Sequence, residues 1–428
     1  MEGGAVDSLF PDDEGWGVEP VEESSSGSPF PLADEVMKYL KNKGVQKADI
    51  YIPYFLASVG AHAANLRVRC IPFTWADVDD SFTILSQFGL TPDLRSHILF
   101  VAPPSWGKTF FMRLMIDPKF GVVAPSTVPH LMATWATEAG LAGSFGTGGN
   151  KEPVKVDGDA EIYSDGIYAC DEMSSFLQDK HVDYNQAMTN TLLQILDTGH
   201  IYKRLVLGQI NSWTRMTMWG GTQPLRLSLE NGIARRFIIL RLSPTLNDEE
   251  EYKDAHSHSY NEEIDLDSLV AIRELVHELF TAARFEHITF SHAYVQWRSQ
   301  VKAQHQDLSW IDKLAIGWAM VSRTTFQQHV LRVDVDDQLK IMVEQALRWR
   351  ASVMIDGPFE DVVALMGSST YERREVYDLM MRLGIGRLKA KLLLHELLEE
   401  GVLLKEQEGS RLVYRVSPHE LKRRLFDE

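Results

Sequence analysis

The sequence predicts an α/β fold with a helical lid, followed by a small C-terminal domain of the winged helix-turn-helix type. Between residues 98 and 243, short apolar runs alternate with helical patterns, which is typical of a mostly parallel sheet flanked by helices. Between residues 359 and 416, helical patterns are followed by two strand-like runs, the order of elements in a winged helix. The length of 428 residues is ample for a large core.

Composition and periodicity divide the chain into five segments. The first is rich in Gly, Ser and acidic residues and precedes the first basic residue, Lys38, so we expect a disordered acidic tail. Apolar residues then recur at helical spacing. The predicted segments are the tail (1–31), an N-terminal helical extension (32–95), the α/β core (96–245), an all-helical lid (246–353) and the winged-helix domain (357–428).

Charge, cysteines and hydropathy bound the compartment and the partners. The net charge of −17 argues against a protein coated in basic patches, although local charge in a channel decides nucleic-acid binding. The sequence has no run of 18 apolar residues and no secretory signal, so we expect no membrane partner. Cys70 and Cys170 form neither a disulfide framework nor a zinc pattern, which fits a reducing interior. We expect the cytoplasm, with the nucleoid, for a prokaryotic or viral chain and the nucleus for a eukaryotic one.

The stretch that organises the chain is ILFVAPPSWGKTFFMRLMID, residues 98–117. An apolar strand is followed by the eight-residue loop APPSWGKT and then by a helical pattern, and this order predicts a phosphate-binding loop. Backbone N–H groups of the loop and of the helix N-terminus would face phosphate oxygens. The residues predicted to bind the nucleotide are Pro104, Ser105, Trp106, Gly107, Lys108 and Thr109.

A pair of carboxylates completes the predicted phosphate chemistry. Lys108 would reach the β- and γ-phosphates of ATP, and Thr109 would offer its hydroxyl to Mg²⁺. About 60 residues further on, the apolar strand GIYAC ends in Asp171 and Glu172. Asp171 would hold Mg²⁺, directly or through water, and Glu172 would polarise the attacking water as general base. Such pairs also begin helices as caps, but the distance from the phosphate loop favours the catalytic interpretation.

Two later elements supply further candidates for the same site. The strand RMTMWGG ends at Thr222 and Gln223; Gln223 is the first candidate for contacting the γ-phosphate or orienting water, and Thr222 is the second. The alternative is a plain strand end before a proline turn. Arg236, in ARRF, can reach the γ-phosphate of a neighbouring subunit. The alternative for Arg236 is a structural ion pair.

Two β-rich runs around LGQ, between residues 198 and 213, predict a hairpin. Lys203 and Arg204 lie on its first arm, where they can contact a phosphate backbone; a purely structural hairpin is the alternative. The glycine-rich run at 140–149 is expected to be a flexible loop. The final domain carries 12 basic and 11 acidic residues from Tyr371 onward, so DNA contact and protein contact both stay open for it.

In this order, the pieces APPSWGKT, SDGIYACDEMSSF, GHIYKRLVLGQINSWTRM, WGGTQP and ARRF resemble the MCM-like group of AAA+ ATPases. WGGTQP and ARRF also look like parts of the helicase-like ATPases of plasmids and viruses. The resemblance covers about residues 98–353, and it implies an AAA+ core, an inserted helix within 123–140 and a homo-hexameric ring. It also implies that Arg236 is the arginine finger, that Gln223 stands at the sensor-1 position, and that Lys203 or Arg204 contacts DNA. Lys313 and Arg323 are candidates for the sensor-2 position.

Three functions follow as hypotheses. The first is a ring-forming, Mg²⁺-dependent ATPase that moves on DNA, single-stranded in a ring channel, as a replicative-type helicase. The second is an ATP-switched replication initiator or helicase loader that works with other replication proteins. The third is a DNA-binding scaffold with a degenerate nucleotide site, and the intact Lys108–Thr109 and Asp171–Glu172 pairs argue against it.

Overall fold

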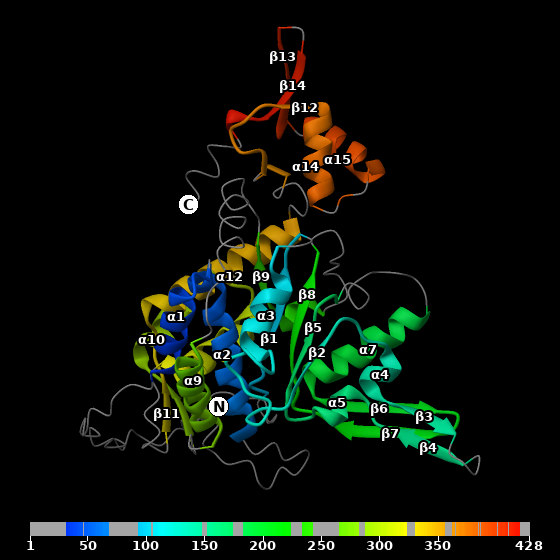
Figure 1. Cartoon of the computed structure of the whole chain (residues 1–428), viewed down its shortest axis with the longest axis vertical. Helices are drawn as coiled ribbons and strands as arrows, with labels where there is room; N and C mark the ends of the chain where they lie inside the picture. The colour runs from blue at the N-terminus through cyan, green and yellow to red at the C-terminus, as the bar shows by residue number, and fades with distance from the viewer. Residues whose placement is uncertain are drawn as a thin grey trace, which may run out of the picture.

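A computed structural model describes most of the chain after the N-terminal tail (Figure 1). The described residues are 31–45, 47–67, 93–103, 106–147, 152–173, 183–223, 233–242, 265–281, 287–322, 330–355, 362–363, 365–383, 385, 387–399, 401–409 and 411–419. The predicted tail therefore lies outside them. None of the helices in these ranges is long and apolar enough to cross a membrane.

A five-stranded parallel sheet forms the centre of the molecule, in the order β2-β5-β8-β1-β9. This confirms the α/β prediction for residues 98–243. The strands are nearly continuous apolar runs, as expected of strands that are covered on both faces. They are β1 (His97–Val101), β2 (His130–Ala133), β5 (Ile167–Cys170), β8 (Thr217–Thr222) and β9 (Phe237–Arg241). Because all five are parallel, their carboxyl ends meet at one edge of the sheet.

The two N-terminal helices, α1 (Leu32–Asn42) and α2 (Ala48–Arg67), match the predicted helical extension. Every residue of α2 from Tyr51 to Asn65 is buried, because the helix lies between the sheet and the helices that follow it (Figure 1). The Phe55 ring packs edge-on against Trp219 of β8 at a centroid distance of 5.0 Å. The Trp219 indole N–H donates to Ser58 Oγ at 2.9 Å. Helix α2 is thus part of the core.

Helix α2 crosses α11 (His305–Ser322) at two glycines. A Cβ on Gly60 would lie 2.2 Å from the carbonyl oxygen of Gly317, and a Cβ on Gly317 would lie 1.9 Å from the carbonyl oxygen of Ala57. No side chain larger than hydrogen fits at either position, so the two backbones touch.

The predicted lid contains α9 (Leu266–Thr281), α10 (His292–Gln300), α11 and α12 (Asp337–Ile355). The prediction that it is all-helical is wrong, because β10 (His287–Phe290) and β11 (Val330–Val333) form a two-stranded parallel sheet. Both strands are rich in β-branched residues, and Ile288, Leu331 and Val333 are buried between the helices. Residues 246–264 of the predicted lid lie outside the described ranges.

The prediction of a flexible glycine-rich loop at 140–149 is also wrong for its described part. Helix α4 (Glu138–Ala142) is capped by the Thr137 side chain, and β3 (Ser144–Thr147) pairs antiparallel with β4 (Pro153–Val156). A short helix, α5 (Asp159–Ile162), follows. Helix α4 starts near the end of the 123–140 range in which the resemblance implies an inserted helix, and it runs two residues beyond that range. A Cβ on Gly158 would lie 2.3 Å from the amide nitrogen of Gly143, so these glycines permit close backbone approach.

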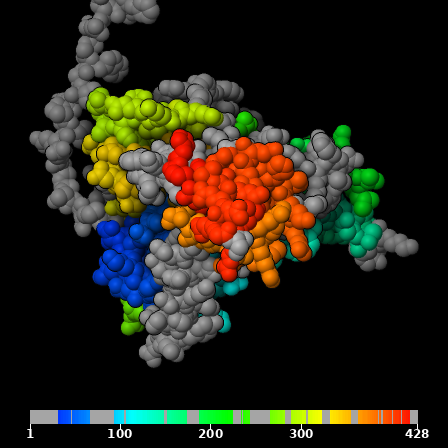
Figure 2. All heavy atoms as spheres, turned by 90° about the horizontal axis from the view of Figure 1, so that it is seen from above, coloured from blue at the N-terminus to red at the C-terminus, as the bar shows by residue number. Residues whose placement is uncertain are grey.

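The C-terminal elements confirm the predicted order of helices followed by two strands. They are β12 (Tyr371–Glu372), α14 (Arg373–Arg382), α15 (Arg387–Glu399), β13 (Leu403–Glu408) and β14 (Arg411–Val416). The strands form an antiparallel sheet in the order β12-β14-β13. These elements have their own apolar core, and Figure 2 shows them gathered over one end of the molecule.

Candidate functional site

The loop after β1 leads directly into α3 (Lys108–Ile116). Gly107 caps this helix with φ +81°, a conformation that favours glycine, and its carbonyl accepts the first helical hydrogen bond from Phe111 N. Trp106 is half-buried and packs against the main core. Pro104 and Ser105 lie outside the described residues. Helix α3 therefore starts at the carboxyl edge of the sheet, where the positive end of a helix favours an anion.

The Lys108 side chain folds back under this loop. It is 8% exposed, and Nζ donates to the carbonyl oxygens of Ala102 (3.1 Å) and Pro103 (3.2 Å). The ammonium thus lies beside the positive end of α3, and the ammonium and the helix N-terminus both attract an anion.

Thr109 and Asp171 meet across the edge of the sheet. The Thr109 hydroxyl donates to Asp171 Oδ1, although the two residues are 62 apart in the sequence. Asp171 follows β5, and its amide donates to the carbonyl oxygen of Ala133 at the end of β2 (2.9 Å). A hydroxyl and a carboxylate in contact are oxygen ligands of the kind that Mg²⁺ takes alongside substrate phosphates.

Glu172 and Gln223 form the second meeting point. Gln223 Nε2 lies 3.4 Å from Glu172 Oε2, so the amide that follows β8 faces the carboxylate that follows β5. The Thr222 hydroxyl is buried and has no hydrogen-bond partner among the described residues. A buried hydroxyl without a partner costs free energy, which a ligand oxygen at this edge would recover.

Gly221 is a residue whose role the sequence analysis missed. A Cβ there would lie 2.4 Å from the carbonyl oxygen of Asp171. The Gly221 carbonyl also accepts from Met173 N at 2.7 Å, which fixes the two strand ends against each other. The signal was the pair of glycines inside an otherwise apolar strand, because such glycines mark close backbone approach.

Arg236 lies at the opposite edge of the sheet. It ends the short 3₁₀ turn Ala234–Arg236 before β9, whereas Lys108 follows the far end of β1, the neighbouring parallel strand. A five-residue strand separates the two edges by about 17 Å. Arg236 donates two hydrogen bonds to the carboxylate of Asp197, the last residue of α7 (Asp183–Asp197). Asp197 was not singled out from the sequence, where no pattern links it to Arg236.

The predicted hairpin is confirmed as β6 (His200–Leu205) and β7 (Gly208–Trp213). Lys203 and Arg204 point to opposite faces, as successive strand residues do. Lys203 is mostly buried and forms an ion pair with Glu138 of α4 at 2.6 Å. Arg204 is exposed on the opposite face of the hairpin.

The candidates for the sensor-2 position do not join this group. Lys313 forms a 3.6 Å ion pair with Asp93, just before β1 and therefore at the amino edge of the sheet. Arg323 lies outside the described residues.

Two buried groups near the sheet, a thiol and an imidazole, are uncharged at neutral pH. Burial raises the pKa of the Cys170 thiol to about 12, so this cysteine stays protonated and is no nucleophile. Burial lowers the pKa of His62 to about 4, and the neutral ring bridges Thr217 Oγ1 (2.9 Å) and the carbonyl oxygen of Asp165 (3.1 Å).

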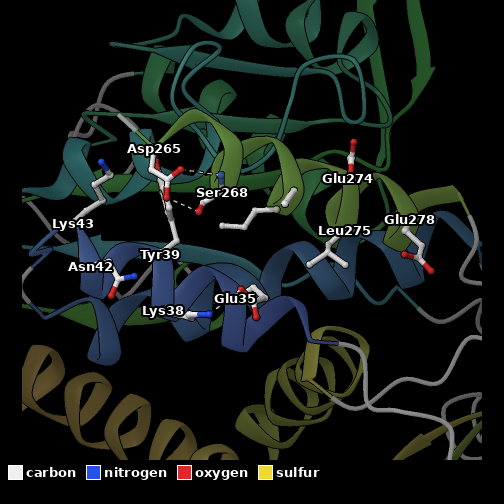
Figure 3. A pocket seen from close by; sticks show the side chains of 12 residues that line it. Glu35, Lys38, Tyr39, Asn42, Lys43, Asp265, Ser268, Glu274, Leu275 and Glu278 are labelled. Carbon is white, nitrogen blue, oxygen red and sulfur yellow. Dashed lines mark hydrogen bonds and ion pairs between the residues drawn. The ribbon is translucent and has the colours of Figure 1, made fainter. Parts of the chain in front are cut away.

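A groove of about 600 Å³ lies between α1 and α9 (Figure 3). Its walls carry both charges: Lys38 and Lys43 stand with Glu35, Asp265 and Glu274. None of the predicted site residues lines it, so it is separate from the edge that holds Lys108 and Asp171.

No protein-family model matches the chain, and no curated protein matches its sequence.

Proposed function

We propose that the chain is a Mg²⁺-dependent ATPase that assembles into a ring and moves on DNA, in the manner of an MCM-like AAA+ helicase. The observation that carries the proposal is the contact between Thr109 and Asp171, which joins the helix start after β1 to the end of β5. Chance placement does not readily bring a loop lysine, a hydroxyl and an acid pair, all predicted from sequence, to one edge of a sheet.

The proposed division of labour follows the geometry. The loop N–H groups and Lys108 bind the phosphates, while Thr109 and Asp171 hold Mg²⁺. Bound Mg²⁺ supplies the positive charge that offsets charge developing on the phosphoryl oxygens. Glu172 accepts a proton from the attacking water, and Gln223, already directed at the Glu172 carboxylate, orients that water.

Lys108 and Arg236 lie at opposite edges of the sheet, and this placement supports a ring. Arg236 is about one strand length from the phosphate edge of its own chain, so it serves the site of a neighbour. A head-to-tail contact of this kind closes into a ring when the rotation permits, and we propose a homo-hexamer.

Two features support DNA as the partner. The hairpin carries the exposed Arg204. The C-terminal elements have helices followed by an antiparallel β13–β14 pair, the arrangement of a winged helix. That domain also favours the second candidate, an ATP-switched initiator or loader.

ATP hydrolysis with and without single-stranded DNA tests the proposal. We expect turnover that DNA stimulates, loss of ATP binding in Lys108→Ala, and a loss of roughly 100-fold or more in turnover with retained binding in Glu172→Gln. The matched controls lie outside the site: Lys119→Ala changes an exposed charge, and Glu161→Gln changes a half-buried carboxylate that pairs with Lys155. Retained ATP binding in Lys108→Ala, or no rings with a non-hydrolysable analogue, would contradict the proposal. Processive unwinding of forked DNA separates the motor from the switch.

A further inference from the structure

The hairpin β6–β7 has two chemically different faces. His200, Tyr202 and Arg204 of β6 pair directly with Trp213, Asn211 and Gln209 of β7, so these six side chains share one face. Five of them are exposed, and His200 is half-exposed. We call this set the outward face. The other face is covered, since Ile201 and Ile210 are fully buried.

The outward face carries a preformed stack of rings. His200 and Trp213 lie parallel with centroids 4.2 Å apart and an interplanar angle of 12°. The imidazole is held in place by a 2.7 Å contact between His200 Nε2 and Asn211 Oδ1. Tyr202 follows on the same strand with its ring 45% exposed, and Trp213 is 43% exposed. His200 is within 6.5 Å of the Tyr202 ring as well, so the three rings form one exposed cluster of the kind that marks an interaction surface.

The charge of this face favours a negatively charged partner. None of its six residues is acidic and one is arginine, whereas the whole chain has a net charge of −17. Aromatic rings next to a cation and amide groups form the combination that stacks bases and contacts phosphates in single-stranded nucleic acid. A duplex keeps its bases stacked on one another, so it cannot use the rings in this way.

The hairpin is also braced where it turns. A Cβ on Gly208 would lie 2.5 Å from the Phe145 ring of β3, so the turn of the hairpin packs on the inserted β3–β4 pair. On the covered face, Lys203 pairs with Glu138 of the inserted helix. A platform fixed in advance loses little conformational entropy when it binds a strand.

We propose that the outward face is a base-stacking platform for single-stranded DNA. Bases stack on Trp213 and Tyr202, Arg204 contacts an adjacent phosphate, and Lys203 acts as a positioning residue through Glu138. This inference rests on the proposed DNA partner and specifies how the strand is held: through its bases as well as its backbone.

The test measures binding of the full-length protein to three labelled strands by fluorescence anisotropy. The strands, each of about 20 nucleotides, are oligo(dT), an abasic strand with the same phosphates, and a duplex. We expect oligo(dT) to bind most tightly. Trp213→Ala and Tyr202→Ala should each weaken oligo(dT) binding by roughly tenfold and leave abasic binding unchanged. Trp213→Phe should retain most of the affinity, and Phe120→Ala, an exposed aromatic in the turn after α3, should change nothing.

Each other outcome overturns the stacking inference in a distinguishable way. If oligo(dT) and the abasic strand bind equally, or if only Arg204→Ala weakens binding, the hairpin contacts the backbone alone and the ATPase proposal survives. If Trp213→Ala abolishes self-association but not DNA binding, the face is an interface between copies. If the wild-type protein hydrolyses ATP and binds none of the strands, the DNA partner falls as well. Basal ATP hydrolysis without DNA should be the same in Phe120→Ala and in the wild type.

Discussion

At the residue scale, Gln223 and Glu172 have different tasks under the proposed function: Gln223 positions the water and Glu172 accepts its proton. The two side chains lie in contact although they follow different strands. Glu172 follows β5 and Gln223 follows β8, so their distance depends on the pairing of those strands. Gly221 sets that pairing at its end, because a side chain there would collide with the Asp171 carbonyl. Under the proposed function, the orientation of the attacking water would therefore depend on backbone packing as well as on the two polar side chains.

Replacing Gln223 by Ala is expected to lower ATP turnover by roughly 10- to 100-fold and to leave ATP binding nearly unchanged. Under the proposed function the amide acts on the attacking water, and loss of one such positioned donor has effects of about this size. Single-turnover kinetics and equilibrium binding of a labelled nucleotide measure the two quantities. A variant that loses binding and turnover together would assign Gln223 to the phosphates. Gln296→Ala, on the exposed side of α10, is the matched control.

His62 makes stability depend on pH. Its pKa is about 4 when folded and near 6.5 when unfolded, because burial disfavours the charged ring. The unfolded chain thus binds more protons between these values, so the stabilisation is present above pH 6.5 and is lost as the pH falls. Lowering the pH from 7 to 5 should cost about 2 kcal/mol through this group alone.

Urea unfolding of the wild type and of His62→Asn checks this expectation. The variant is expected to be less stable at neutral pH, since the contact with Thr217 is altered, but to lose less stability on acidification. Burial also lowers the pKa of His97, which is unchanged in both proteins and supplies a common background. Parallel declines in the two proteins would show that His62 does not titrate as described.

At the scale of elements, the crossing of α2 and α11 ties the N-terminal helices to the lid. Tyr54 extends the connection, because its hydroxyl donates to the carbonyl oxygen of Met342 in α12 at 2.6 Å. Tyr51 reaches the carbonyl oxygen of Arg241 at the end of β9 at 3.1 Å. One helix therefore contacts the sheet and the lid together, in addition to the direct packing of α12 on β9.

Gly60→Ala should destabilise the protein by about 1–3 kcal/mol, since the new methyl group would overlap the Gly317 carbonyl and force the helices apart. Thermal or urea unfolding measures the loss. Gly146→Ala is the control, because the nearest atom to its added Cβ is a side-chain carbon 3.7 Å away. Equal stability of Gly60→Ala and the wild type would mean that the two helices separate at no cost.

The elements that the sequence predicts well are those with local signals. The apolar run before APPSWGKT, the helix after it and the hairpin around residue 207 all follow from neighbouring residues. The missed features depend on distant partners. Strands β10 and β11 are four residues each and stabilise each other across 40 residues, and the glycine-rich run gains its structure only by packing on residues 153–158.

The candidate site divides in the same way. Alternation along β6 predicts that Lys203 and Arg204 face opposite sides, but which side is covered depends on Glu138, far earlier in the chain. Strand-end positions predict that Asp171, Glu172 and Gln223 gather at one edge. The partner of Arg236 could not be predicted, because Asp197 is one of many acidic residues and only the fold brings the two together.

At the scale of the whole molecule, a complete site requires two chains under the proposed function. Arg236 is held by Asp197 in its own chain, and it must leave or share this carboxylate to reach a neighbour's phosphate. Asp197 also stands just before the first strand of the hairpin. A change of nucleotide in one subunit would thus alter the contact between Arg236 and Asp197 in the next subunit, at the base of that subunit's hairpin.

Mixing two inactive variants tests this arrangement. Lys108→Ala and Arg236→Ala should each abolish turnover alone, but an equal mixture should recover about a quarter of the wild-type rate, because that share of sites combines an intact loop with an intact arginine. Steady-state ATP hydrolysis after mixing measures the recovery. A mixture that stays inactive, from chains shown to assemble together, would place Arg236 outside the neighbour's site.

Burial of α2 has a consequence for how the chain is made. Residues 51–65 leave the ribosome early, whereas Gly317 and Met342, which cover them, follow more than 250 residues later. At ordinary elongation speeds, roughly 15 to 55 s therefore pass between the synthesis of this apolar helix and the synthesis of the residues that cover it. During that interval the nascent chain is a natural client for chaperones. Truncation anywhere before α12 would make this exposure permanent, so fragments of the protein should aggregate even when their sheet is complete.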